Sequence, residues 1–138
     1  MKKDKMLLKD IKELIGGKSL TNDILLGRNI KYCFGADLMS DVLRFARTGS
    51  LLLTGLTNNQ VLQVSEILDL KGIIFVRGKL PGNGFIEEAE KRKLPLLASD
   101  KLMFDTCGIL YSNGLKGGKS LLEVKDEPAN NIQPVVSD

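Results

Sequence analysis

The sequence predicts an α/β domain of three layers, in which helices cover both faces of a mainly parallel sheet. Three short apolar runs support this prediction: SLLLTG from Ser50, GIIFVRG from Gly72 and LPLLASD from Leu94. Each run is unbroken and ends in a polar or glycine turn, as is typical of strands buried on both faces. The chain between Gly55 and Gly78 is long enough for a crossover helix, which parallel neighbours require.

Length and composition are those of one globular domain. The chain has 138 residues, of which 43% are hydrophobic and 27% charged, and a chain of this length can bury a core without a disulfide or a metal. We expect the domain to span residues 1–115 and a flexible C-terminal tail to span residues 116–138, where Pro128 and Pro134 interrupt a segment of little periodicity. The net charge is only +3, which argues against nucleic-acid binding.

Several classes of protein are disfavoured by what the sequence lacks. No apolar run approaches the roughly 20 residues of a membrane-spanning helix, and the opening MKKDKMLLKD does not resemble a secretory signal. We therefore expect a cytoplasmic protein without membrane contact. Cys33 and Cys107 form no CxxC pattern, so we expect free buried thiols. The chain has no His, the commonest general base and metal ligand, and we expect no metal and no cofactor.

The elements ahead of the first buried strand can be assigned in order. Residues 6–17, MLLKDIKELIGG, predict an amphipathic helix closed by two glycines. Short extended pieces are expected around residues 18–20 and 29–34. The segment GADLMSDVLRFA, residues 35–46, has helical spacing of its apolar residues, and Asp37 is placed to be the N-cap of this helix.

Three further helices are expected after the buried strands. The first begins with TNNQ, in which Thr57 and Gln60 have the spacing of a capping box. The second, about residues 84–93, has acidic residues early and basic residues late, which suits the helix dipole. The third runs from about residue 101 to residue 111 and ends near Asn113.

Gly118, Lys119 and Ser120 resemble the end of a phosphate-binding P-loop. The motif requires glycine where this chain has Asn113, and a P-loop follows a strand, whereas this segment follows a predicted helix. We therefore interpret it as a helix end followed by a flexible basic linker.

Polar residues and glycines follow each of the three predicted strands. In an open parallel sheet, ligands bind outside the carboxyl ends of the strands. Glycine permits close approach of the backbone, a helix N-terminus carries partial positive charge, and Arg77 has the geometry to bind phosphate or carboxylate. The alternative to a ligand site is structural: the glycines form tight turns, the threonines form local caps, and Arg77 is solvated. The candidate ligand-binding residues are Thr54, Gly55, Thr57, Asn58, Arg77, Gly78, Lys79, Ser99 and Asp100.

Asp37 and Asp41 lie one turn apart on the predicted helix 35–46 and form a possible secondary site. A pair of carboxylates can hold Mg²⁺ or bind a ligand, whereas an N-cap and a first-turn acid explain the pair by structure alone, and we favour this second interpretation. No nucleophile stands with a base, and no carboxylate pair is placed for acid–base catalysis. The sequence predicts a protein that is not an enzyme.

Several blocks of the sequence together resemble the DRTGG domain family in its short stand-alone form. They are CFGADLMSDVLRFA, LLLTGLTNNQVLQVSEIL, GIIFVRGKLP, LPLLASDKLMFDTCGILY and GLKGG. The family is similar to the N-terminal domain of HPr kinase, so the resemblance implies a three-layer, HPr kinase N-terminal-domain-like fold. It also implies an accessory role in regulation or ligand sensing, and an association of stand-alone members with serine-kinase-like and hydrogenase-related genes.

The chain departs from the pattern after which the family is named. Many members have Thr-Gly-Gly and then Asp-Arg after the corresponding strand, whereas this chain continues Thr54, Gly55, Leu56. Only the Thr-Gly part is retained, so the resemblance implies no contact by the missing Asp and Arg. The catalytic activity of HPr kinase resides in a separate P-loop domain, and kinase activity is not implied.

Two functions follow as hypotheses. The first is a non-enzymatic cytoplasmic regulatory or ligand-sensing module that binds an anionic or nucleotide-like small molecule at the carboxyl ends of the strands. The alternative is a homodimeric protein-interaction module without a small-molecule site, which docks on a redox or signalling enzyme. A Mg²⁺-dependent phosphotransferase built on Asp37 and Asp41 is disfavoured, because further converging ligands are missing from the sequence.

Overall fold

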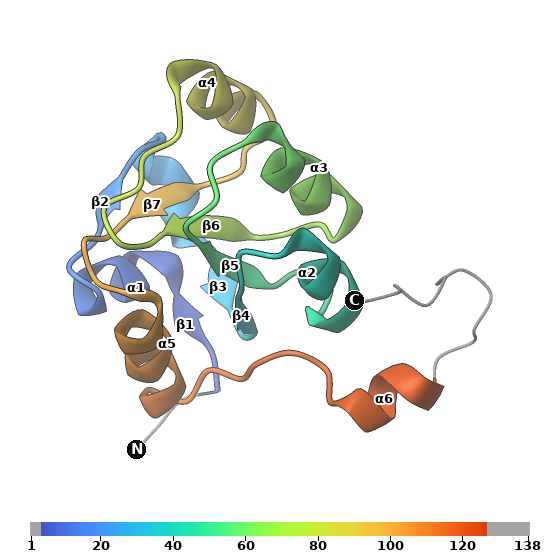
Figure 1. Ribbon diagram of the computed structural model, residues 1–138. Helices are drawn as coiled ribbons and strands as arrows, with labels where there is room; N and C mark the ends of the chain where they lie inside the picture. The colour runs from blue at the N-terminus through green and yellow to red at the C-terminus, as the bar shows by residue number, and fades with distance from the viewer. Residues whose placement is uncertain (1–3, 127–138) are drawn as a thin grey trace.

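The computed structural model describes residues 4–126, and Figure 1 shows their arrangement. A five-stranded sheet has the strand order β2-β7-β6-β5-β4, and a separate two-stranded sheet pairs β1 with β3. The elements are β1 (Met6–Leu7), α1 (Leu8–Leu14), β2 (Lys18–Ser19), the 3-10 helix η1 (Asp23–Gly27), β3 (Asn29–Ile30), β4 (Cys33–Gly35), α2 (Met39–Phe45), β5 (Leu51–Thr54), α3 (Asn59–Ile67), β6 (Gly72–Phe75), α4 (Asn83–Lys91), β7 (Leu96–Ala98), α5 (Met103–Ser112) and α6 (Leu121–Asp126).

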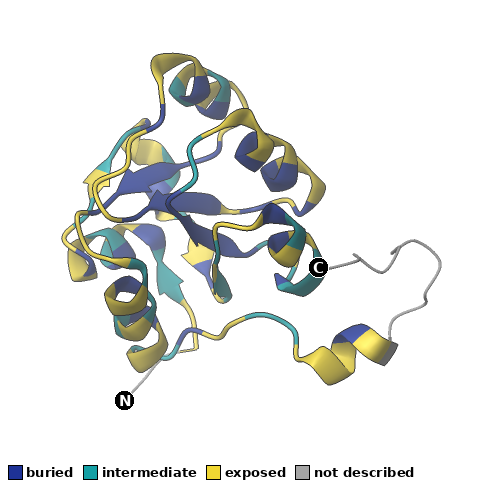
Figure 2. Cartoon of the chain, viewed as in Figure 1, coloured by how far each residue is buried: buried dark blue, intermediate teal, exposed yellow. Residues whose placement is uncertain are grey.

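The predicted fold class is confirmed. The four strands from β4 to β7 run parallel, and only the edge strand β2 is antiparallel. The three apolar runs of the sequence are β5, β6 and β7, and every residue of these strands is buried. They form the dark centre of the molecule in Figure 2. Among residues 4–126, none of the helices has the length and apolar character of a membrane-spanning segment.

Alternation along the strands divides the core into two halves, one on each face of the sheet. Leu52, Ile73 and Phe75 pack with residues of α2, α3 and α4. Leu51, Leu53, Ile74 and Leu97 pack with residues of α1 and α5 on the other face. Helices therefore cover both faces, as the unbroken apolar runs predicted.

Two predicted helix caps are wrong. Helix α3 is capped by Asn58, whose side-chain oxygen accepts a hydrogen bond from the backbone N–H of Gln60 at 3.0 Å, so the expected capping box of Thr57 does not form. Leu38 occupies the N-cap position of α2 and makes no side-chain cap. The carboxylate of Asp37 is instead turned toward the end of β5, where it accepts hydrogen bonds from the Thr54 hydroxyl and the Gly55 N–H.

The segment that follows α5 is more regular than the sequence suggested. Lys116 forms an isolated parallel bridge with Tyr32, and α6 occupies part of the predicted flexible tail. Ser120 and Glu123 form a reciprocal capping box, with both hydrogen bonds at 3.1 Å. The rest of that predicted tail, residues 127–138, lies outside the described residues.

Close packing explains why residue 118, in the stretch that resembles a P-loop, is glycine. A Cβ atom at this position would lie 2.5 Å from the carbonyl oxygen of Phe45 and 2.8 Å from the ring of Phe34. The backbone N–H of Lys119 donates to the same Phe45 carbonyl at 2.7 Å. The backbone N–H of Ser120 donates to the Glu123 carboxylate, so these two donors have partners within the protein.

We expect Gly118→Ala to destabilise the protein by about 1–3 kcal/mol, because its methyl group forces the chain away from Phe45. Gly117→Ala is the matched control, since a Cβ there lies 4.0 Å from the Cys33 carbonyl oxygen, its nearest neighbour, and we expect a change within about 0.5 kcal/mol. Urea denaturation measures both. Equal effects of the two substitutions would show that the close contact with Phe45 is not the reason why residue 118 must be glycine.

Candidate functional site

Four residues meet where β4, β5 and β6 end, and we call them the strand-end cluster: Asp37, Thr54, Gly55 and Arg77. One carboxylate oxygen of Asp37, Oδ1, accepts a hydrogen bond from the Thr54 hydroxyl at 3.0 Å and from the Gly55 N–H at 2.7 Å. The other oxygen, Oδ2, lies 3.5 Å from an Arg77 guanidinium nitrogen. Three donors from two neighbouring strand ends thus converge on one anion.

The backbone places these groups. Ala36 donates its N–H to the Leu53 carbonyl at 3.1 Å, which carries Asp37 past the end of β5. Arg77 has a positive φ of 50°, a conformation that costs a non-glycine residue about 1–2 kcal/mol. Its side chain folds back over Gly55, where any Cβ would lie 2.6 Å from the guanidinium. Glycine at position 55 therefore leaves the space that the arginine fills.

These contacts favour the charged form of Asp37. The pKa of its carboxyl is lowered from the usual value chiefly by the hydrogen bond from the Gly55 N–H; partial burial opposes this effect, and the Thr54 hydroxyl and Arg77 add to it. The side chains of Asp37 and Arg77 are about half exposed, at 50% and 44%, so solvent screens their attraction. The cluster is thus an anion site whose occupant is a carboxylate of the protein itself.

The other sequence candidates have different places. Asn58 caps α3. The buried Ser99 hydroxyl donates to the Ile15 carbonyl at 2.9 Å and accepts from the Lys101 N–H, so it closes a turn. Lys79, Gly78 and Asp100 are exposed beyond the ends of β6 and β7. Thr57 is partly buried ahead of α3. Ligand binding by the nine predicted residues stays a prediction.

The two predicted secondary residues do not act as a pair. Asp37 joins the strand-end cluster, whereas Asp41 is exposed on the first turn of α2 and takes no part in the cluster. Within residues 4–126, no group of three or more Cys, Asp or Glu side chains is arranged to hold a metal ion. Asp41 therefore keeps its structural interpretation as a first-turn acid, whereas Asp37 binds the end of β5 instead of capping α2.

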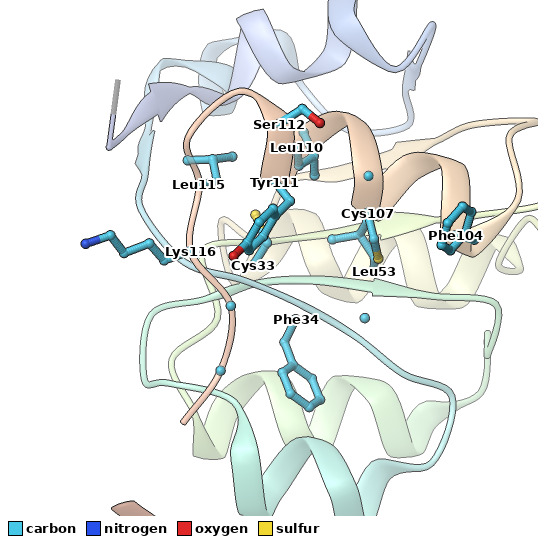
Figure 3. A pocket seen from close by; sticks show the side chains of 14 residues that line it. Cys33, Phe34, Leu53, Phe104, Cys107, Leu110, Tyr111, Ser112, Leu115 and Lys116 are labelled. Carbon is cyan, nitrogen blue, oxygen red and sulfur yellow. The ribbon is translucent and has the colours of Figure 1, made fainter. Parts of the chain in front are cut away.

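A cavity of about 400 Å³, which the sequence did not predict, lies beside β4 and is called the edge pocket. Its lining comes from β4, from Leu53 of β5, from one face of α5 and from residues 115–118, as Figure 3 shows. Leu53, Phe104 and Tyr111 give it an apolar wall. None of the four cluster residues lines it. No single motif points to such a site, because it is assembled from separate parts of the chain.

Both cysteines lie in the edge pocket and are free, as predicted. Burial, and to a smaller extent the neighbouring Cys107, raises the pKa of the Cys33 thiol to about 12. Burial also raises the pKa of Cys107. Both thiols are therefore protonated at neutral pH and act as apolar lining.

Comparisons with known proteins support the fold. A similar solved structure contains the CBS and DRTGG domains of the regulatory region of a Clostridium perfringens pyrophosphatase, in complex with its activator, diadenosine tetraphosphate. The TM-score is 0.62 at 16% sequence identity, and the match covers 80% of this chain and 47% of that chain. This chain thus spans about half the length of that one.

At this identity the likeness shows a DRTGG-related fold and no more. No protein-family model matches the chain, and no curated protein sequence matches it. The structure and the comparison together define its class as an α/β domain related in fold to part of a regulatory region.

The lowered pKa of Asp37 makes stability depend on pH. A carboxyl whose pKa falls on folding stabilises the protein above its unfolded pKa of about 3.9, and this contribution is lost as the pH falls through the folded value. We expect Asp37→Asn to reduce the free energy of unfolding near pH 7 by about 0.5–1 kcal/mol, a small effect because the side chain is half exposed.

Urea denaturation at a series of pH values measures this dependence. The difference between wild type and Asp37→Asn should shrink as the pH falls below the usual range of an aspartate. Asp41→Asn is the control, because it removes the same charge at a nearby position, on the first turn of α2 and outside the cluster. A difference that is independent of pH would contradict the role assigned to the ionised carboxylate.

Proposed function

We propose that the protein is a non-enzymatic regulatory module of the DRTGG type, acting in the cytoplasm, that senses an anionic small molecule at the strand-end cluster. The observation that carries the proposal is the convergence of the Thr54 hydroxyl, the Gly55 N–H and Arg77 on one carboxylate. Donors that hold a carboxylate are also suited to a phosphate, which takes the same charged hydrogen bonds.

The neighbouring surface favours an anion as well. Lys79 and Lys101 are exposed close to Arg77, whose backbone N–H donates to the Lys101 carbonyl at 2.8 Å. Their positive charges attract an incoming anion. The pyrophosphatase region of related fold binds a dinucleotide of four phosphates, so nucleotides and pyrophosphate are the first probes to test.

Regulation follows from competition with Asp37. This carboxylate joins the start of α2 to the ends of β5 and β6 through its three contacts. A ligand anion that takes the Gly55 N–H and Arg77 displaces Asp37 and frees residues 36–38 to move. The start of α2 is thereby coupled to ligand occupancy, as a sensing module requires.

A second candidate function is protein interaction. Phe104 and Tyr111 on α5 are 85% and 74% exposed, and Leu122 on α6 is 71% exposed. Large exposed apolar side chains are common in interfaces. In this proposal the chain forms a homodimer, or docks on a serine-kinase-like or hydrogenase-related protein. Light scattering at high protein concentration tests the dimer, and a monomer would count against it.

Isothermal titration with inorganic pyrophosphate, ATP and diadenosine tetraphosphate tests the anion site. We expect at least one probe to bind, and Arg77→Gln to weaken that binding about tenfold, since a hydrogen bond to a charged group is worth about 1.5 kcal/mol or more.

Lys91→Gln is the matched control, because it removes the same charge from the exposed end of α4, outside the cluster, and should leave the affinity unchanged. Absence of heat with all three probes, or equal weakening by both substitutions, would overturn the proposal.

A further inference from the structure

The edge pocket lies along the open edge of β4, and the strand directs backbone groups toward it. In the ladder with β5, the Tyr32 carbonyl accepts from the Leu51 N–H at 2.8 Å, and the Ala36 N–H donates to the Leu53 carbonyl. Successive residues of a parallel strand bond to opposite sides. Cys33 and Gly35 therefore point their N–H and C=O groups away from β5, toward the outer edge.

On this edge, the chain that follows α5 forms one isolated parallel bridge. The Cys33 N–H donates to the Lys116 carbonyl at 2.8 Å, and the Lys116 N–H donates to the Lys31 carbonyl at 3.1 Å. The chain then leaves β4 toward α2, where the Lys119 N–H bonds to Phe45. Beyond the bridge, the Cys33 C=O and the backbone groups of Gly35 form no backbone hydrogen bond with the described residues that follow Lys116.

The walls around this edge are apolar and partly aromatic. Figure 3 shows Leu53, Cys107, Phe104 and Tyr111 on one side of β4, with Phe34 on the other. Helix α5 lies close to Gly35 of β4. A Cβ on Gly35 would lie 2.7 Å from the Cys107 sulfur and 3.0 Å from that of Met103. Gly35 is exposed, so its donor and acceptor at the edge of this cavity are accessible to a ligand with a matching polar edge.

We propose that the edge pocket binds a planar nitrogen heterocycle of the nucleobase class. The ring packs its faces against Phe104, Tyr111 and Leu53, and its polar edge forms paired hydrogen bonds with the N–H and C=O of Gly35. A flat ring with apolar faces and a polar edge matches both the walls and the backbone of the pocket. The volume of about 400 Å³ suits one such ring system, since small-molecule sites span roughly 300–1,000 Å³.

This inference does not rest on the anion site. The strand-end cluster and the edge pocket have no lining residue in common, and their chemistry differs, since one binds charge and the other binds a ring. Nucleosides, which carry the ring without a phosphate, are therefore the probes: adenosine, guanosine, cytidine and uridine. Arg77→Gln should weaken anion binding while nucleoside binding stays measurable, so the failure of one proposal is distinguishable from the failure of the other.

Gly108 offers a clean way to fill the pocket. It lies on α5 among the lining residues, and a Cβ built there meets nothing within 4 Å. Gly108→Leu therefore places a side chain in the cavity without a clash at Cβ, in a helix that gains from the loss of glycine. Gly84→Leu is the matched control, because Gly84 also lies in a helix, α4, with open space at its Cβ, and it is not part of the pocket lining.

Binding is measured by isothermal titration and by protection of Cys107 from N-ethylmaleimide. We expect at least one nucleoside to bind wild type and Gly84→Leu equally, and to slow the alkylation of Cys107 severalfold. Gly108→Leu should weaken the binding at least tenfold. Absence of binding by all four nucleosides at millimolar concentration would overturn the proposal. Nucleoside binding that Gly108→Leu leaves unchanged would also overturn it.

A second variant keeps the test decisive if Gly108→Leu does not fold. Phe104 is 85% exposed at the pocket, so Phe104→Ala removes a ring face at little cost to stability. We expect it to weaken nucleoside binding severalfold. Ile24→Ala, at a position 81% exposed on η1, is its control and should bind as wild type does. Equal affinities of Phe104→Ala and wild type would count against the ring site.

Discussion

Burial of β5, β6 and β7 on both faces is the constraint on which the rest of the structure depends. Each strand is covered by helices on two sides, so the polar groups that the strands leave at their ends must find partners inside the protein. Ser50 before β5 donates to the Arg47 carbonyl, and Ser99 after β7 donates to the Ile15 carbonyl. Thr54 at the end of β5 donates to Asp37. The strand-end cluster is therefore a consequence of the buried sheet as well as a candidate site.

The two edges of the sheet are protected in different ways. The antiparallel β2 covers β7 at one edge. At the other edge, β4 is only three residues long, and its outer side meets the chain again at Lys116 for a single bridge. Short edge strands and partial covers limit unwanted pairing with other chains. The pocket lies where the chain after Lys116 leaves the edge of β4. There Gly118 packs against the Phe45 carbonyl, and the Lys119 N–H donates to it.

The sequence predicted those features that depend on local pattern. Unbroken apolar runs identified β5, β6 and β7, and the spacing of apolar and charged residues identified α3, α4 and α5 to within a few residues. The role of Asp37 was missed, because a carboxylate before a helix can cap that helix or bond to a distant strand, and only the packed structure decides between them. The capping box of Ser120 and Glu123 was present as a local signal, but the irregular sequence that follows obscured it.

The edge pocket was beyond prediction for a different reason: its lining comes from segments that only the fold brings together. Its position also gives the domain a way to couple two ligands. Gly35 at the pocket and Asp37 in the strand-end cluster are separated only by Ala36, whose N–H is held by Leu53. A ring that fixes Gly35 and an anion that displaces Asp37 act on the same short stretch of backbone. Each ligand would then change the affinity of the other by the same factor, as thermodynamic linkage requires.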